Sequence, residues 1–204
     1  LGFAGAAAAQ DAKAGEKKAT MCIGCHGIGG YQASFPEIHK VPMISGQGAK
    51  YIAASLAAYK KGDRKHPTMR AIAVSLTDQD MADLSAFYEQ HGGKEASPTP
   101  PDGAAPASAE VTALLTKGAC ASCHGANYSK PIDGTYPKIA GQHADYLYVA
   151  LKAYKTDANP QVGRNNAIMG GQVKQFTLAE LKAMAAYLSS LPGEMRTVKE
   201  PYFR

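Results

Sequence analysis

Apolar side chains recur at helical spacing in three segments of each half of the chain. In the first half, Ile52, Leu56 and Tyr59 share one face of a predicted helix over residues 49–61. Thr77, followed three residues later by an aspartate, marks a helix start because its hydroxyl satisfies a free backbone amide. The predicted helices cover residues 11–23, 49–61 and 77–88, and again 108–117, 144–154 and 177–188. No segment alternates like a half-buried strand, so the pattern predicts an all-α protein.

The two halves are repeats of one another. Residues 42–47 (PMISGQ) match residues 137–142 (PKIAGQ) at a shift of 95, and Met69 matches Met169 at a shift of 100. Each repeat must then be a complete folding unit, or lobe. The linker between them is rich in Pro and Gly, so we expect it to be extended and semi-stiff. We predict an N-terminal extension over 1–10, lobes over 11–92 and 108–195, the linker over 93–107 and a tail over 196–204.

Composition limits the class of protein. The 204 residues are 45% hydrophobic and 19% charged, which excludes wholesale disorder. No stretch reaches the ~18–20 consecutive apolar residues that a membrane-spanning helix needs. The net charge is only +5, without a dense Lys/Arg run, so we expect no nucleic-acid partner. Lobes of this size have small cores, and the low aromatic content of 8% suits lobes that are built around a large apolar cofactor.

All four cysteines lie in two clusters, CIGCHG at residues 22–27 and CASCHG at residues 120–125. C-x-x-C-H is the attachment site of a c-type haem, in which both thiols bond to the porphyrin and the histidine binds iron. A disulfide or a thioredoxin-like redox pair leaves the histidine unexplained, twice. A shared zinc site would join clusters that lie 98 residues apart. We therefore predict two covalently bound haem c groups, attached through Cys22 and Cys25 and through Cys120 and Cys123.

The second axial ligand separates an electron carrier from a haem that binds small molecules. His26 and His124 are the proximal ligands, and Met69 and Met169 follow them by 43 and 45 residues. We expect both methionines in a loop before the third helix of their lobe. A thioether favours Fe(II), and six-coordinate iron has no open site for oxygen or peroxide. A lone methionine is more often a packing residue, but its recurrence in both repeats favours ligation and electron transfer.

Other residues compete for the distal position of haem 1. Met43 is one candidate, although its repeat partner is Lys138, and His66 is another, although the second lobe has no histidine there. The remaining histidines are expected to be exposed or to cap helices: His39, His91 and His143.

Two further pairs are candidates for supporting the haems. A proximal histidine needs its other ring nitrogen fixed by a backbone acceptor, a role for Pro42 and Pro137, which are otherwise ordinary loop prolines. Arg64 and Arg164 precede the two methionines and either pair with haem propionates or lie at the surface.

The two C-x-x-C-H-G sites, the P-x-I-x-G-Q segments, the tyrosine-bearing second helices and the paired methionines together resemble the di-haem cytochrome c4 family over residues 11–191. The resemblance implies two class I cytochrome c lobes about a pseudo-twofold axis, with the haem propionate edges facing each other. It implies His26 with Met69 and His124 with Met169 as axial pairs, and the prolines as histidine acceptors. The first lobe departs from the family in a longer segment over 31–41, which leaves the surroundings of haem 1 less defined.

The resemblance also implies a periplasmic carrier that passes electrons from a quinol-oxidising complex or a periplasmic dehydrogenase to a terminal oxidase or other acceptor of a respiratory chain. An alternative is an electron-accepting subunit or partner of a dehydrogenase, for example one that oxidises thiosulfate or sulfide. A di-haem enzyme or gas sensor is a third hypothesis, but attachment uses all four cysteines and no acid–base cluster is evident. We therefore predict an electron-transfer protein rather than an enzyme.

The N-terminal residues and the haem chemistry indicate the same compartment. Covalent haem attachment takes place outside the bacterial cytoplasm. Residues 1–10, LGFAGAAAAQ, resemble the tail of a secretory signal that is cleaved near Ala9. If the mature protein keeps them, they form a docking or anchoring segment instead. We expect a periplasmic protein that associates with a membrane only through this segment or through a partner.

Overall fold

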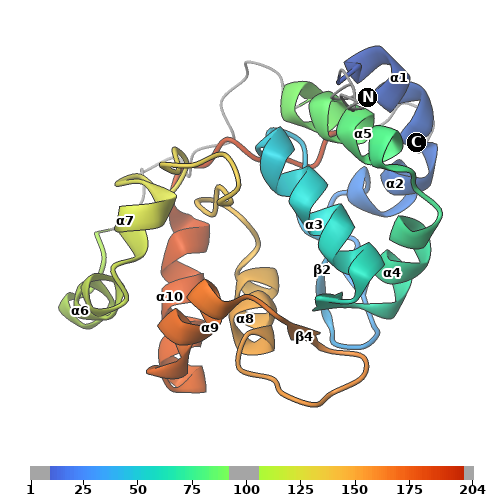
Figure 1. The fold of residues 1–204 in the computed structure, drawn as a ribbon. Helices are drawn as coiled ribbons and strands as arrows, with labels where there is room; N and C mark the ends of the chain where they lie inside the picture. Colours follow the sequence, from blue (N-terminus) through green and yellow to red (C-terminus); the bar gives the residue numbers. More distant parts are fainter. Residues whose placement is uncertain (1–9, 92–105, 200–204) are drawn as a thin grey trace, which may run out of the picture.

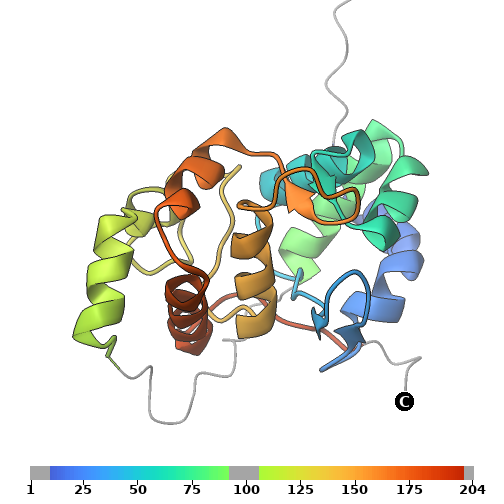
Figure 2. The same cartoon turned by 90° about the horizontal axis from the view of Figure 1, so that it is seen from below.

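The computed structural model describes residues 10–91 and 106–199, which form two helical lobes side by side (Figures 1 and 2). Most of the predicted N-terminal extension and linker, and residues 200–204 of the tail, lie outside the described residues. The first lobe holds α1 (Ala12–Lys18), α2 (Thr20–His26), α3 (Ala49–Lys61), α4 (Pro67–Val74) and α5 (Asp78–His91). The second holds α6 (Ala109–Lys117), α7 (Cys120–His124), α8 (Ala144–Ala153), α9 (Ala167–Lys174) and α10 (Leu178–Ser190).

Side chains cap the predicted helix starts. Thr177 and Glu180 form a reciprocal capping box at the start of α10. The helix predicted over residues 11–23 is instead two helices, because the Ala19 amide bonds to the Glu16 carbonyl (3.2 Å), three residues back rather than four. This tightened turn ends α1, and α2 then carries the first pair of cysteines.

Met69 and Met169 lie on helices, not in the loops that we predicted. His66 caps α4 and Asn166 caps α9, and each accepts a hydrogen bond from the backbone amide of the methionine three residues on (3.4 and 2.9 Å). Each helix has eight residues and buries only one of them fully, so apolar periodicity does not reveal it. The signal that was available is Pro67 at the first helical position.

Each lobe packs its N-terminal helix against its C-terminal helix. In the first lobe α1 approaches α5 so closely that a Cβ at Gly15 would lie 2.1 Å from the Asp83 carbonyl oxygen, so only glycine fits. In the second lobe α6 packs on α10 through leucines. The fully buried cores comprise Ala19, Ile52, Leu76, Met81, Leu84 and Tyr88 in the first lobe, and Leu114, Leu115, Leu147, Val173, Phe176, Leu181, Met184, Ala185 and Leu188 in the second.

Two short strand pairs, which the sequence did not predict, complete the fold. β1 (Gln32–Ala33) and β2 (His39–Lys40) form a hairpin, and β3 (Arg64–Lys65) pairs with β4 (Gly163–Arg164) of the other lobe. Each strand has two residues, too few for an alternating pattern. The C-terminal segment also returns to the first lobe, where Arg196 pairs with Ser45. Among residues 10–91 and 106–199, backbone pairing therefore joins the lobes at two places.

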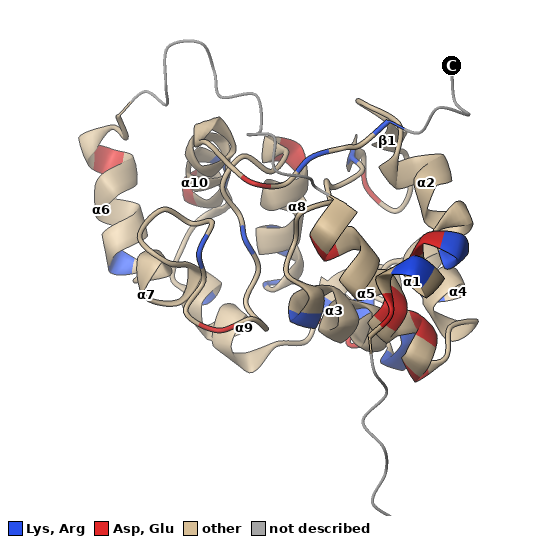
Figure 3. Ribbon diagram, turned by 90° about the horizontal axis from the view of Figure 1, so that it is seen from above, with Lys and Arg blue, Asp and Glu red and all other residues tan. Residues whose placement is uncertain are grey.

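Acidic and basic residues are interspersed along the chain in both lobes (Figure 3). They meet between α1 and α5, where Lys18 Nζ lies 2.7 Å from carboxylate oxygens of both Asp80 and Asp83. Among the described helices, none combines the length and apolarity needed to cross a membrane.

Candidate functional site

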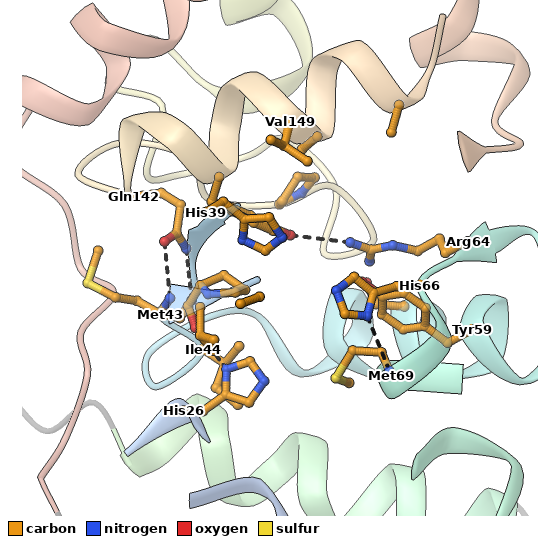
Figure 4. Close-up of a pocket in the computed structure, with 18 of the residues that line it drawn as sticks. His26, His39, Met43, Ile44, Tyr59, Arg64, His66, Met69, Gln142 and Val149 are labelled. Atoms are coloured by element: carbon orange, nitrogen blue, oxygen red, sulfur yellow. Dashed lines mark hydrogen bonds between the residues drawn. The ribbon is translucent and has the colours of Figure 1, made fainter. Parts of the chain in front are cut away.

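A cavity of about 470 Å³ extends through both lobes and is lined mainly by apolar side chains. His26 and Met69 line it from the first lobe, as Figure 4 shows, and His124 and Met169 line it from the second. A large apolar ligand with a few polar contacts is the kind of molecule that such a cavity takes.

The four cysteines lie on the two short helices that end in these histidines. Cys22 and Cys25 are three residues apart on α2, and Cys120 and Cys123 on α7, so each pair shares one helix face. All four are half-buried, and none of them forms a disulfide. Cys22 and Cys25 also line the cavity. Each pair has the spacing for two thioether bonds to one porphyrin.

Both histidine rings are held by a proline carbonyl. His26 Nδ1 lies 2.8 Å from the carbonyl oxygen of Pro42, and His124 Nδ1 lies 2.8 Å from that of Pro137. A carbonyl only accepts, so each neutral ring carries its proton on Nδ1 and presents a bare Nε2. Burial lowers the pKa of both imidazoles, against the smaller opposing effect of the carbonyl. A neutral imidazole with a bare Nε2 is the form that binds iron.

The other candidates for the distal position have different contacts. His66 Nδ1 caps the N-terminus of α4, and Asn166 caps α9 from the same repeat position. In both lobes the side chain at this position therefore binds a backbone amide at the start of a helix. Met43 also lines the cavity, while its backbone is bound by Gln142 of the other lobe (Figure 4). The methionines at 69 and 169 are the potential ligands that the two lobes have in common.

His39 was expected to be exposed or to cap a helix, and this was wrong. It is buried, with its ring 6.1 Å from the ring of His66 and 5.8 Å from that of Tyr146, between centroids. The β1–β2 hairpin folds it onto the cavity. Of the other two histidines, His91 Nδ1 lies 3.0 Å from the Ser45 hydroxyl, and His143 precedes α8 without a side-chain cap bond.

Arg64 and Arg164 meet between the lobes. The β3–β4 register places them opposite each other, and both guanidinium groups donate to the Tyr146 hydroxyl (3.3 and 3.0 Å). Their side chains are half-buried overall, and their charged ends are enclosed. The Cζ atom of Arg64 lies 4.7 Å from the centre of the Tyr59 ring, and that of Arg164 lies 5.4 Å from the centre of the Tyr154 ring. In the sequence, the tyrosines that contact the two arginines were recognised only as residues that recur in both repeats. The signal that was missed is that tyrosines and arginine recur together in both lobes.

This arginine pair tests whether the residues fit a haem. Within residues 10–91 and 106–199, neither guanidinium forms an ion pair with a carboxylate, and the buried Nε of Arg64 has no hydrogen-bond partner. Burial opposes ionisation of Tyr146, but the charges of Arg164 and Arg64 outweigh it and lower its pKa to about 8. Enclosed cations without anions are costly, and haem propionates are anions of the required kind. The site therefore fits the group that the cysteine motifs imply.

Comparison with known proteins agrees with this geometry. The cytochrome c family model matches residues 12–91 and 108–192, one match in each lobe. The chain is 31% identical to cytochrome c4 of Azotobacter vinelandii over 94% of each protein. The chain belongs to the cytochrome c4 family. Its fold matches the crystal structure of reduced recombinant cytochrome c4 from Pseudomonas stutzeri with a TM-score of 0.69 and 27% identity, over 90% of this chain and 100% of that one.

A second relative bears on electron transfer. The chain is 29% identical to a thiosulfate dehydrogenase electron acceptor of Stutzerimonas stutzeri, over 88% of this chain and 82% of that protein. As a cytochrome c4 family member, the chain is a di-haem electron-transfer protein, not an enzyme, and it carries two covalently attached haem c groups. The predictions of the family, of two all-α cytochrome c lobes and of the cofactor are confirmed.

Proposed function

We propose that this cytochrome c4 family member is a periplasmic electron carrier with two closed irons, one bound by His26 and Met69 and the other by His124 and Met169. The observation that carries the proposal is one arrangement repeated in both lobes. A neutral histidine, fixed by a proline carbonyl, lines a cavity that a methionine also lines from the first turn of a capped helix. Ligation from both sides leaves iron no exchangeable position.

Each haem, when bound, supplies an iron that alternates between Fe(II) and Fe(III). His26 with Met69, and His124 with Met169, would hold that iron in either oxidation state. The carbonyls of Pro42 and Pro137 orient the imidazole rings and make them more basic. The thioethers of the methionines favour Fe(II), and the apolar walls exclude water. Little rearrangement is then needed when an electron arrives or leaves.

Arg64 and Arg164 bind haem propionates in this proposal. The two arginines come from different lobes but lie opposite each other in one strand pair, with Tyr146 bonded to both. Propionates from both lobes would share this one cluster of positive charge. The shared cluster brings the two cofactors together at the interface and favours electron transfer from one lobe to the other.

The donor is a quinol-oxidising complex or a periplasmic dehydrogenase, and the acceptor is a terminal oxidase or another acceptor of a respiratory chain. The likeness to a thiosulfate dehydrogenase electron acceptor favours one alternative, in which the chain is an electron-accepting subunit or partner of a dehydrogenase that oxidises thiosulfate. Stopped-flow reduction by each purified donor separates the candidates, because the physiological donor should reduce the protein much faster than the other does.

The absorption spectrum of the oxidised protein tests the iron ligands. Bonding of a thioether to Fe(III) gives a weak far-red band, whose intensity should equal that of two His/Met haems. Met69→Ala and Met169→Ala should each halve this intensity. His66→Asn, which gives α4 the cap residue of α9, should leave it unchanged. A one-haem intensity in the unaltered protein, insensitive to one of the methionines, would contradict the proposal for that lobe.

A further inference from the structure

Two glutamines cross the interface, and each binds the residue that follows the proline of the P-x-I-x-G-Q segment in the other repeat. Gln142 Nε2 donates to the Met43 carbonyl (2.8 Å), and its Oε1 accepts from the Met43 amide (3.0 Å). Gln47 makes the same pair of bonds with Lys138 (2.9 and 3.0 Å). The glutamines are only 5% (Gln47) and 4% (Gln142) exposed. Figure 4 shows the Gln142 pair of bonds near His26.

Both glutamines follow a glycine in the left-handed conformation. The φ angle is +85° at Gly46 and +73° at Gly141. A Cβ would lie 2.4 Å from the Glu194 carbonyl oxygen at Gly46 and 3.1 Å from the Leu191 carbonyl oxygen at Gly141. The segment that follows α10 packs against both positions, and together with the positive φ angles it favours glycine at 46 and at 141. This turn directs each glutamine of the P-x-I-x-G-Q segments toward the opposite lobe.

Met195 lies between the two side-chain amides. Its Sδ is 3.1 Å from Gln47 Nε2 and 3.6 Å from Gln142 Nε2, and the residue is 1% exposed. The Oε1 atoms also accept from the amides of Gly48 and His143 (2.9 and 3.0 Å). Every donor and acceptor of both side-chain amides is thus used, which fixes their orientation.

One peptide group connects each glutamine to a proximal histidine. The peptide between Pro42 and Met43 accepts from His26 Nδ1 at its oxygen and donates to Gln142 Oε1 at its nitrogen. The peptide of residues 137–138 makes the equivalent pair of bonds in the other lobe. Hydrogen bonds in series polarise one another, by roughly 10–30% per bond. A bond at the N–H therefore makes the carbonyl a stronger acceptor for the histidine proton.

We propose that each glutamine is a positioning residue for the haem of the opposite lobe and lowers the reduction potential of that haem. This inference rests on the proposed ligation by His26 and His124. A stronger hydrogen bond from Nδ1 places more negative charge on the imidazole, which favours Fe(III) over Fe(II). Gln142 therefore acts on the haem of the first lobe and Gln47 on that of the second.

Substitution of one glutamine at a time tests the crossed assignment. In Gln142→Leu the reduction potential of the first-lobe haem should rise while that of the second-lobe haem stays unchanged. In Gln47→Leu the potential of the second-lobe haem should rise while that of the first-lobe haem stays unchanged. We expect a shift of roughly two- to fivefold in the reduction equilibrium of the affected haem, about 20–40 mV at 59 mV per tenfold change. The measurement is a redox titration of the haem-loaded protein followed by NMR, with haem methyl resonances assigned to lobes from Met69→Ala and Met169→Ala.

Met195→Leu is the matched control for loosened packing. It removes the shared sulfur and keeps all four hydrogen bonds to the peptides, so both potentials should stay unchanged. Equal shifts of both haems in either glutamine variant, or shifts of the same size in Met195→Leu, would overturn the proposal. Where a leucine variant does not fold, Gln142→Asn and Gln47→Asn, which retract the amide by one methylene, should give the same crossed pattern.

The far-red spectrum of the same samples separates two kinds of failure. Two intact His/Met haems without a crossed shift would refute the role of the glutamines alone. A spectrum of the unaltered protein without two His/Met haems would refute the proposed ligation itself.

Discussion

In each lobe the N-terminal helix crosses the C-terminal helix, α1 on α5 and α6 on α10, but different kinds of side chain hold the two crossings together. In the first lobe, Asp83 of α5 is buried and accepts hydrogen bonds from Lys18 Nζ (2.7 Å) and from the Asp11 amide (3.0 Å) of the α1 segment. In the second lobe the position equivalent to Asp83 is Ala183, and the α6–α10 crossing is packed by Leu114, Leu115 and Leu181. One crossing is held by charge and the other by apolar volume.

The histidines of the two lobes are nevertheless held alike. Both proximal rings lie 2.8 Å from a proline carbonyl, and both methionines lie in the first turn of a capped helix. The crossing itself is therefore what the haem site needs, and its chemistry is free to vary. Because a charged crossing responds to pH and an apolar one to lost volume, the two lobes should fail under different perturbations.

Loss of haem attachment should have the largest effect and should distinguish the lobes. Replacing Cys22 and Cys25 with serine removes one haem per chain, and replacing Cys120 and Cys123 removes the other, which mass spectrometry counts. We expect more helix to be lost in the first variant, because the first lobe buries fewer large apolar side chains. Equal losses of helical circular dichroism would contradict this difference.

Replacing a buried side chain of a crossing with alanine should destabilise the protein more in the second lobe, where apolar side chains hold the crossing, than in the first. Leu181 is 0% exposed, so Leu181→Ala should lower the free energy of unfolding by about 4 kcal/mol. Asp83→Ala loses its bonds from Lys18 and the Asp11 amide and should cost about 2 kcal/mol. Denaturant unfolding of the haem-loaded protein measures both values, and a larger loss for Asp83→Ala would reverse this order.

Acid should weaken the first crossing through Asp83. The hydrogen bonds from Lys18 and the Asp11 amide hold the pKa of this carboxyl below its usual range. A carboxylate with a lowered folded-state pKa stabilises the fold above its unfolded pKa, about 3.9, and this contribution is lost as the pH falls from there through the folded pKa. Asp83→Asn should therefore flatten the fall in melting temperature on acidification.

Glu180→Gln is the matched control in the second lobe. The bonds from Thr177 also lower the pKa of Glu180, but Thr177 is its one hydrogen-bonding partner among the described residues. This substitution should flatten the acid response less than Asp83→Asn does. The same flattening in both variants would mean that the α1–α5 crossing is not the acid-sensitive element.

His66→Asn should have the smallest effect. Asn166 makes the same bond to the amide of its methionine, so we expect a change in the free energy of unfolding below about 0.5 kcal/mol. The reciprocal Asn166→His should be equally mild. A gain of thioether signal in His66→Asn would show that His66, rather than Met69, is the ligand in the unaltered protein.

Much of the fold and the cofactor followed from the sequence because both rest on local or repeated signals. Two C-x-x-C-H motifs specify covalent chemistry at fixed spacing, and the repeat divided the chain in two. Strong apolar periodicity placed both ends of α3 at Ala49 and Lys61. Pro42 was identified because a proximal histidine needs a backbone acceptor, and its role, like that of Met69, stays a prediction.

Contacts made by docking of the lobes did not follow from the sequence. No local pattern places Gln142 against Met43 or Arg64 opposite Arg164, because these residues are about 100 positions apart and meet through tertiary structure. Burial of His39 likewise depends on a hairpin of two-residue strands. The polar chemistry between the lobes is therefore visible only in the folded molecule.

Carbon monoxide binding by the reduced protein tests most directly the central claim that both irons are closed. This ligand needs an exchangeable position on iron, so the spectrum of the unaltered protein should not change when the gas is added. Met69→Ala and Met169→Ala should each bind it at one haem. Stoichiometric binding by the unaltered protein at either haem would contradict the account, because that iron would lack its methionine.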